Sequence, residues 1–258
     1  MRADPGPAAA LDEIPADTTP GRSLLAKLDA FRRPFLRIVI ALLLGFLLAF
    51  AFATRIRDVI MKPLARVLPD GSRLIYTQTA EGFMLNLKIA ALVGLILASP
   101  YLLWQVWRLL VPVLSRRARR RALAFVFFAT LLFLAGASFA HFVVFPWVWT
   151  FLASFATSYM QFMPAIAPTF SLYVKIVLAL GLTFQMPVVV FFLARLGVVT
   201  HRTLIHYGRY AVLVAFIVGA VVTPPDIVSQ VLLAAPLVGL YGLAIGIAWL
   251  CAPSKRDA

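Results

Sequence analysis

The stretch IVSQVLLAAPLVGLYGLAIGIAWL, residues 227–250, contains no charged side chain. It is longer than the ~20 residues that a helix needs to cross a hydrocarbon core about 30 Å thick. Similar apolar runs that are nearly free of acids lie upstream, and the chain as a whole is 62% hydrophobic. This pattern excludes a soluble globule and predicts an all-α membrane protein with six transmembrane helices. The five upstream runs lie near residues 35–54, 83–110, 122–145, 169–194 and 210–222.

The positive charges collect on one side of such a six-helix bundle. Most of the 24 lysines and arginines lie in the N-terminal arm, in the loops after the second and fourth runs, and in the C-terminal tail. Because positive charge marks cytoplasmic segments, both termini are predicted to be cytoplasmic, in a multi-pass protein of the cytoplasmic (inner) membrane. The net charge of +14 then indicates contact with anionic lipids at the cytoplasmic face. A nucleic-acid partner is not expected.

Composition divides the chain into three parts. Residues 1–21 are rich in Pro, Ala and Asp and are predicted to be a disordered arm. Residues 22–250 are expected to form one six-helix transmembrane domain, followed by a cytoplasmic tail at 251–258. The domain opens with a basic amphipathic segment, residues 22–33, which is expected to lie along the inner membrane surface.

Prolines indicate where the helices should bend or stop, because proline lacks the backbone N–H that a helix uses. Pro100 in the second run and Pro187, two residues after Gln185 in the fourth, are expected to kink their helices. Lys62-Pro63-Leu64 predicts a helix interruption in the outer segment that follows the first run. Pro146 is expected to end the third helix and to open a second outer segment, residues 146–168.

The fifth run is short. From Tyr210 to Val222 a helix would rise only about 20 Å, which is less than the hydrocarbon thickness. A span of that length must thin the bilayer or be shielded by neighbouring helices. We therefore expect the fifth span to be a docking surface for a partner helix.

The sequence carries no recognisable catalytic machinery. It lacks the serine-hydrolase and zinc-protease motifs, and no apolar run contains a pair of carboxylates for general acid–base chemistry. The three histidines are scattered, which argues against a metal site. We therefore predict that the protein is not an enzyme and has no cofactor.

Three polar residues lie at or near membrane depth. Asp226 follows two prolines and precedes the last run, where it is expected to cap the helix N-terminus, with a functional role as the alternative. Glu81 lies where the second span begins, and either reaches water or makes a polar contact in a cavity. Gln185 lies in mid-span, where a buried amide needs a hydrogen-bond partner, so a functional contact with a partner helix is favoured.

Taken together, the motifs of residues 24–250 resemble those of the TatC family, the polytopic subunit of the twin-arginine protein translocase. The most specific element is Thr223-Pro224-Pro225-Asp226 after the fifth run. The order in which this and the other motifs follow one another across six spans strengthens the resemblance. Those motifs are Leu28 with Phe31-Arg32, Lys62-Pro63-Leu64, Thr77 to Phe83, Pro100, Gln105-Val106-Trp107, Pro112, Gly136, Phe139, Pro146, Phe184-Gln185, Pro187, Arg209-Tyr210, Ser229-Gln230, Pro236 and Leu240-Tyr241.

The resemblance implies a fold, partners and an activity. The fold is a concave bundle with a cytoplasmic signal-peptide site, here at Asp29, Phe31 and Arg32. The partners are the single-span subunits TatA and TatB, signal peptides of folded cargo, and further copies within a receptor complex. The activity is movement of folded proteins driven by the proton-motive force. The residues expected to contact partner helices or to line a polar cavity are Glu81, Phe83, Gln185 and Asp226.

The chain departs from the family pattern at acidic positions. Ala30 and Ala118 stand where the family has the two glutamates that pair with the arginines of the signal, and Gln185 and Gly242 stand where glutamate is frequent. Strong bidentate pairing with arginine needs a carboxylate. Asp29 is the remaining acid near that surface, so twin-arginine recognition is expected to be weakened.

The sequence leaves two other functions open. A TatC-like paralogue could have a structural or assembly role without binding twin-arginine signals. A small-molecule transporter is disfavoured, because no charged residue lies at the centre of a run and the two halves show no repeat.

The charge distribution makes a topology prediction. Reporter domains fused after residues 70, 118, 158, 203 and 254 should report outside, inside, outside, inside and inside, because basic loops stay in the cytoplasm. An inside signal at residue 70 or 158 would contradict the six-span arrangement.

Overall fold

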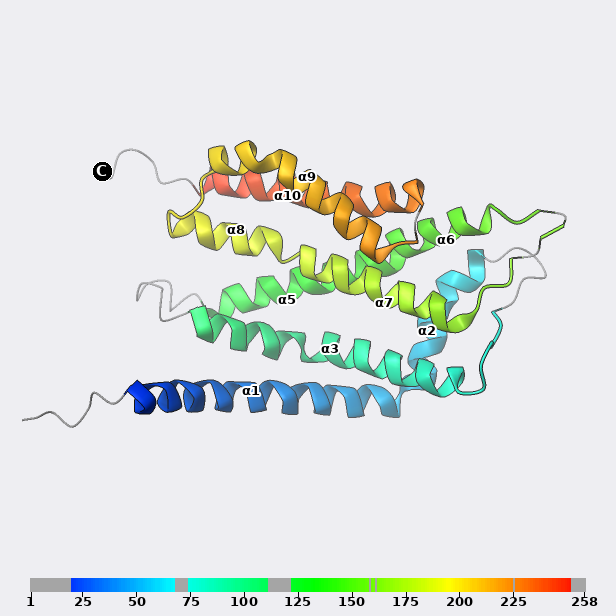
Figure 1. Ribbon diagram of the computed structural model, residues 1–258, viewed down its shortest axis with the longest axis horizontal. Coiled ribbons are helices and arrows are strands. Elements are labelled where there is room, and N and C mark those ends of the chain that lie inside the picture. The colour runs from blue at the N-terminus through cyan, green and yellow to red at the C-terminus, as the bar shows by residue number, and fades with distance from the viewer. Residues whose placement is uncertain are drawn as a thin grey trace, which may run out of the picture. The chain divides into compact units, whose positions relative to one another are not determined.

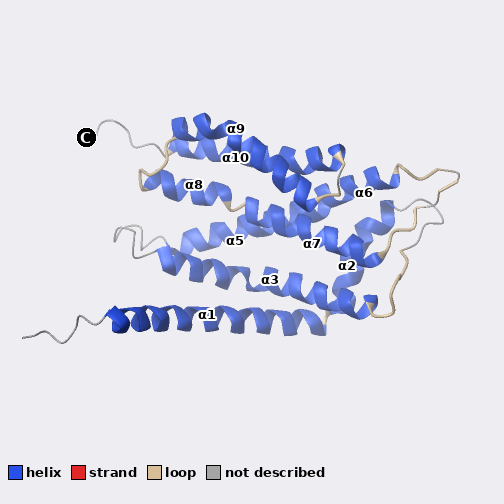
Figure 2. Ribbon diagram, viewed as in Figure 1, coloured by secondary structure: helices blue, strands red, loops and turns tan. Residues whose placement is uncertain are grey.

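The computed structural model describes residues 20–67, 74–110, 122–157, 159–160, 162–224 and 226–251. In this part of the chain the secondary structure is helical, apart from two isolated β-bridges (Figure 2). Figure 1 labels the helices, which are α1 Pro20–Ala51, α2 Ala53–Val67, α3 Glu81–Leu110, α5 Ala122–Phe139, the π-helical turn η2 Ala140–Val144, α6 Phe145–Ala153, α7 Ile166–Thr183, α8 Met186–Arg195, α9 His201–Val222 and α10 Ile227–Leu250.

Six stretches of the described chain are long and apolar enough to cross a membrane, which confirms the prediction of six spans. The acidic content is low within each of them, and their ends lie close to the ends of the apolar runs in most cases. The spans are Pro34–Ala51, Glu81–Arg108, Phe125–Ala153, Ile166–Arg195, His201–Val222 and Ile227–Leu250.

The first helix is longer than the first apolar run. Residues 22–33 are helical, as predicted, and continue into the span as part of α1. The chain divides into two compact units between Ile40 and Ala41, and the packing described below is that of the second unit. The expected arm up to residue 19 and the tail from residue 252 lie outside the described residues.

The apolar core is centred on α7. This helix contacts α3, α5, α9 and α10, and its residues Phe170, Ile176 and Leu180 are fully buried. Ile89 of α3 and Leu233 of α10 close the core from either side, and neither is exposed to solvent. Because apolar side chains facing lipid gain nothing from the hydrophobic effect, this close packing is what holds the helices together.

An aromatic cluster joins three helices at the other end of the bundle from the α3 N-terminus. Trp107 of α3 lies 4.3 Å from Phe125 of α5 and 4.6 Å from Phe192 of α8, measured between ring centroids. The two phenylalanine rings meet edge to face at 4.2 Å. Aromatic pairs in such geometries contribute about 0.5–1.5 kcal/mol each beyond the area they bury.

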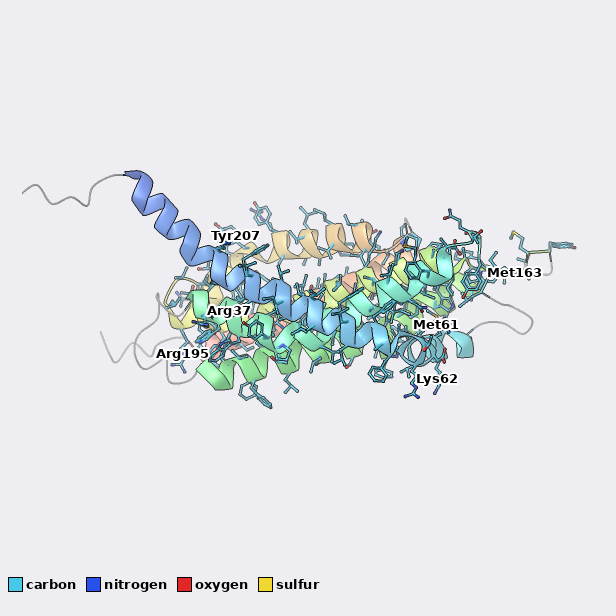
Figure 3. All side chains as sticks on the ribbon, turned by 90° about the horizontal axis from the view of Figure 1, so that it is seen from below. Arg37, Met61, Lys62, Met163, Arg195 and Tyr207 are labelled. Carbon is cyan, nitrogen blue, oxygen red and sulfur yellow. The ribbon has the colours of Figure 1, made fainter. Side chains whose placement is uncertain are left out.

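The two ends of the bundle carry different residues. Figure 3 shows Lys62 and Met163 at one end and Arg195 at the opposite end. The charge distribution in the sequence assigns the first of these to the outside. We call it the outer end, and the end with Arg195 the inner end.

Two of the proline predictions were wrong. Helix α2 runs from Ala53 to Val67 through Pro63 without the expected interruption, since one proline removes a single backbone bond and need not end a helix. Pro146 does not end the third span either, because η2 and α6 extend it to Ala153. The wide π-helical turn directly before Pro146 accommodates the residue without an N–H.

The fourth span is broken where expected. α7 ends at Thr183, α8 begins at Met186, and Gln185 lies in the turn between them, with Pro187 in the first turn of α8. Pro100 lies inside the continuous helix α3.

The prediction of a short fifth span was wrong. α9 begins at His201, nine residues before the apolar run, and has 22 residues, which corresponds to about 33 Å. Thr200 caps its N-terminus by accepting a hydrogen bond from the backbone N–H of Thr203. Polar residues can extend a helix beyond its apolar run. The apolar run 210–222 therefore underestimates the length of α9.

Close helix contacts depend on glycine. Gly94 of α3 packs against the end of α1, where a Cβ added to it would lie 2.6 Å from the backbone nitrogen of Phe46. Gly45 is equally crowded on the other side of this contact. Small residues at such crossings let helix backbones approach closely inside a membrane.

The contact between α1 and α3 makes a stability prediction. Gly94→Ala should lower the free energy of unfolding by about 1–3 kcal/mol, because the new methyl group overlaps rigid backbone. The matched control is Gly239→Ala in α10, where nothing lies within 4 Å of the added Cβ. The control should be neutral or stabilising by up to about 1 kcal/mol, because alanine favours the helix. Denaturant unfolding in detergent measures both, and equal effects of the two variants would contradict the assigned contact.

Candidate functional site

A short backbone connection sets α3 and α7 side by side at the outer end. The N–H of Ile75 donates to the carbonyl of Pro164 at 3.2 Å, and the N–H of Ile166 donates to the carbonyl of Ile75 at 3.1 Å. The residues just before α3 are thereby tied to those just before α7.

Glu81 is buried at the start of α3, with 6% of its surface exposed. Its carboxylate accepts a hydrogen bond from the backbone N–H of Thr77 at 2.9 Å and another from the hydroxyl of Thr77. Of the two possibilities for Glu81, a polar contact is therefore the one observed, and its partner is Thr77 in the turn before α3. Phe83, two residues on, is 59% exposed at the surface of the bundle.

Asp226 caps α10, as predicted. Its carboxylate accepts a hydrogen bond from the backbone N–H of Ser229 at 2.6 Å. At the end of α9, the hydroxyl of Thr223 donates to the carbonyl of Gly219 at 2.8 Å. The amide of Gln230 reaches back to the carbonyl of Phe216 at 3.0 Å. This corner is therefore a rigid reversal between two packed spans.

Gln185 has a partner inside the chain. Its side-chain amide donates to the carbonyl of Ala129 in α5 at 3.0 Å. The glutamine lies in the break between α7 and α8 and ties that break to a neighbouring helix. The expected contact of Gln185 with a partner helix stays a prediction.

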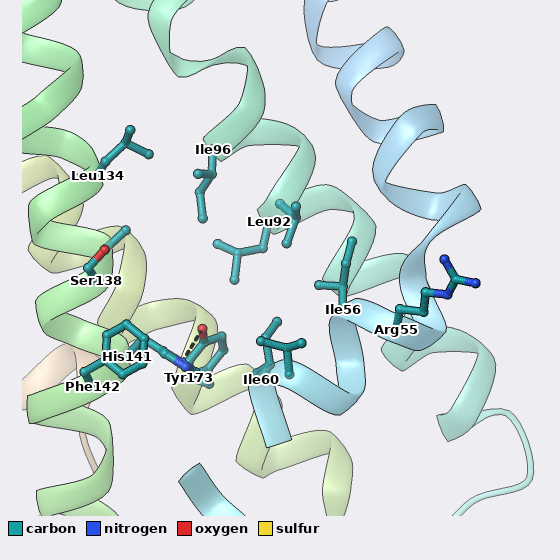
Figure 4. Close-up of a pocket in the computed structure, with 13 residues that line it drawn as sticks. Arg55, Ile56, Ile60, Leu92, Ile96, Leu134, Ser138, His141, Phe142 and Tyr173 are labelled. Carbon is teal, nitrogen blue, oxygen red and sulfur yellow. Dashed lines mark hydrogen bonds between the residues drawn. The ribbon is translucent and has the colours of Figure 1, made fainter. Parts of the chain in front are cut away.

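A cavity of about 400 Å³ opens between α2, α3, α5 and α7. Figure 4 shows Leu92 and Leu134 on its walls, with His141 and Tyr173 at one end and Arg55 pointing away. Nδ1 of His141 and the hydroxyl of Tyr173 are 3.1 Å apart and share a hydrogen bond. Most of the residues that line the cavity are apolar, and His141 and Tyr173 form a hydrogen-bonded polar pair among them.

This cavity is not visible in the sequence. His141 looked like an isolated histidine because its partner Tyr173 is 32 residues away in the chain. No spacing rule connects the two residues, since they come from different spans and meet only after packing. The described residues contain no cluster of three or more His, Cys, Asp or Glu side chains that could hold a metal ion.

The residues expected to bind a signal peptide are only partly described. Arg32 is an exposed residue of α1, and the backbone of Asp29 and Phe31 is helical, while their side chains lie outside the description. Ala118 lies outside the described residues. Gly242, on α10, is exposed, with nothing within 4 Å of an added Cβ.

Fold and polar residues together define a class of protein. This is a multi-pass membrane protein with polar side chains that form hydrogen bonds at helix breaks and helix ends. The chain matches the family profile described as "Sec-independent protein translocase protein (TatC)" over residues 26–236. It belongs to the TatC family.

Relatives in several bacteria support this membership. A TatC protein of Halothiobacillus neapolitanus is 39% identical over 84% of this chain, although the match spans only 59% of that relative's length. The TatC protein of Carboxydothermus hydrogenoformans is 36% identical over 90% of this chain and 95% of the relative. A solved structure titled "Crystal Structure of Twin Arginine Translocase Receptor- TatC" superposes with a TM-score of 0.79 at 32% identity, covering 87% of this chain and 98% of that chain. The family is one of protein-translocase components of the bacterial inner membrane.

Proposed function

We propose that this protein is the core receptor subunit of a twin-arginine-type translocase, which moves folded proteins across the cytoplasmic membrane using the proton-motive force. The observation that carries the proposal is the superposition on a solved twin-arginine receptor, with a TM-score of 0.79 over 98% of that chain. Sequence and fold thus agree over nearly the whole receptor. The internal bonds of Gln185 and Asp226 fit a rigid scaffold on which signal peptides and partner subunits assemble.

Signal recognition is the step at which this chain should differ from its family. A hydrogen bond between an arginine and a carboxylate contributes roughly 1.5–3 kcal/mol when desolvated, and less when exposed. Ala30 and Ala118 supply no carboxylate. The remaining acid, Asp29, can pair with only one of the two arginines of a signal.

We predict weak and poorly selective signal binding by the natural chain. Its affinity for a twin-arginine peptide should rise at least about tenfold in the double variant Ala30→Glu with Ala118→Glu, since about 1.4 kcal/mol of added pairing corresponds to that factor. The double variant should also reject a twin-lysine peptide more strongly, because only arginine pairs with a carboxylate through two parallel bonds. Affinity is measured on the detergent-solubilised full chain at fixed salt.

The matched control is Ala30→Gln with Ala118→Gln, which adds similar bulk without charge and should bind like the natural chain. Tight binding by the natural chain together with rejection of the lysine peptide would show that Asp29 or a partner supplies the missing charge. The idea of a weakened site would then be wrong.

The α9 helix is the proposed docking surface for TatA- or TatB-like single-span subunits. The reason is not its length but its exposure. Only Ala215 and Gly219 of α9 are buried, while Leu213, Phe216 and Ile217 are exposed over a third or more of their surface. An apolar face of this size on one span leaves room for a partner helix to pack beside it.

Crosslinking tests the docking surface. Single cysteines at Leu213, Phe216 and Ile217, in a chain with Cys251→Ser, should crosslink to TatA- or TatB-like proteins in membranes. Cysteine at Leu131 of α5, which is 50% exposed, is the control for a lipid-facing position and should crosslink much less. Crosslinks confined to the first or third span would contradict the assignment.

A further inference from the structure

Lys88 is a cation placed below the outer end of the bundle. It lies seven residues into α3, which puts it about 10 Å from the start of the helix. Its side chain is exposed, and its ammonium donates a hydrogen bond to the hydroxyl of Ser171 on α7 at 2.9 Å. The hydroxyl of Ser171 donates in turn to the carbonyl of Ala167 at 2.8 Å. The ammonium is thus held sideways against α7, and two of its three N–H groups remain for a ligand.

No carboxylate neutralises Lys88 within the part of the chain that the structure describes. The one ion pair there joins Arg57 to Asp58. Lys175, one turn further along α7 from Ser171, is also exposed and adds a second positive charge on that face. Charged groups at this depth are costly unless they meet a counter-charge. The site therefore favours an anion.

An apolar groove of about 340 Å³ runs inward from Lys88 between α3 and α7. Beyond Lys88 and Ser171 its walls are aliphatic, ending at Leu95 and Leu178. Each of these leucines lies seven residues further along its helix than the polar residue above it, so the groove extends about 10 Å toward the membrane centre. The groove therefore has a cationic end near the membrane surface and an apolar end closer to the membrane centre.

We propose that this groove binds one anionic phospholipid of the outer leaflet, with the phosphate on Lys88 and Ser171 and one acyl chain along Leu95 and Leu178. A lipid has the same order of charge and apolar chain along its length. A partner helix bearing an acid fits less well, since a 10 Å length of helix about 10 Å wide occupies roughly 800 Å³, more than twice the groove. The site is distinct from the basic inner face, because it lies at the opposite end of the spans.

Native mass spectrometry of the delipidated full-length chain, titrated with dioleoyl phosphatidylglycerol, tests the proposal. Lys88→Gln should weaken the tightest phosphatidylglycerol site about tenfold, while Lys88→Arg should retain it. The matched control is Lys62→Gln, which removes an exposed charge from the same end of the bundle without lining the groove, and should bind like the natural chain. Dioleoyl phosphatidylcholine, with the same chains and no net charge, should bind at least several-fold more weakly.

A second variant separates the acyl chain from the phosphate. Ala91→Trp fills the groove below Lys88 and should also lose the tight site, with the charge intact.

Soluble glycerol phosphate has the headgroup without the chain and should not compete at millimolar concentration. Unchanged phosphatidylglycerol affinity in Lys88→Gln would overturn the proposal. Effective competition by glycerol phosphate, or full binding by Ala91→Trp, would overturn the acyl-chain part. Thermal unfolding checks that each variant is folded. If Lys88→Gln does not fold, the phosphatidylglycerol affinity of Ala91→Trp still tests whether the lipid occupies the groove.

Discussion

The structure depends on one constraint, which is that a polar group inside a membrane must find its partner within the protein. In this chain, polar side chains make hydrogen bonds within the protein at places where the spans break or begin. Gln185 ties the break of the fourth span to α5, Asp226 caps the last span, and Glu81 closes the turn before the second. These residues were singled out as functional candidates, and the described contacts give all three a structural role first.

The same constraint explains why the proline predictions failed in some places and held in others. Pro187 lies in the first turn of α8, directly after the break of the fourth span, and Gln185 in that break is tied to α5. Pro146 follows a π-helical turn, which absorbs the missing N–H, so the third span continues. A proline therefore marks a place where one backbone bond is missing, and its surroundings decide whether the helix bends, widens or ends.

The scaffold and the proposed receptor role are connected through rigidity. A hydrogen bond from Gln230 of α10 to Phe216 of α9 holds the corner between these helices, which keeps the exposed face of α9 in a defined position. A surface that must bind partner helices gains affinity when it does not have to be ordered on binding. The groove below Lys88 adds a place where the lipid itself could become part of this scaffold.

Composition and pattern alone determined the class, the number of spans and the capping role of Asp226, because hydropathy and local hydrogen bonding act over a few neighbouring residues. The motif order also identified the family before any contact was known. Only the tertiary structure decided the pairing of His141 with Tyr173, the bond from Gln185 to Ala129, the crowding at Gly94 and the groove of Lys88 with Ser171. Each of these joins residues from different spans. Helix register and packing angle determine which side chains meet, and neither is encoded in the spacing along one helix.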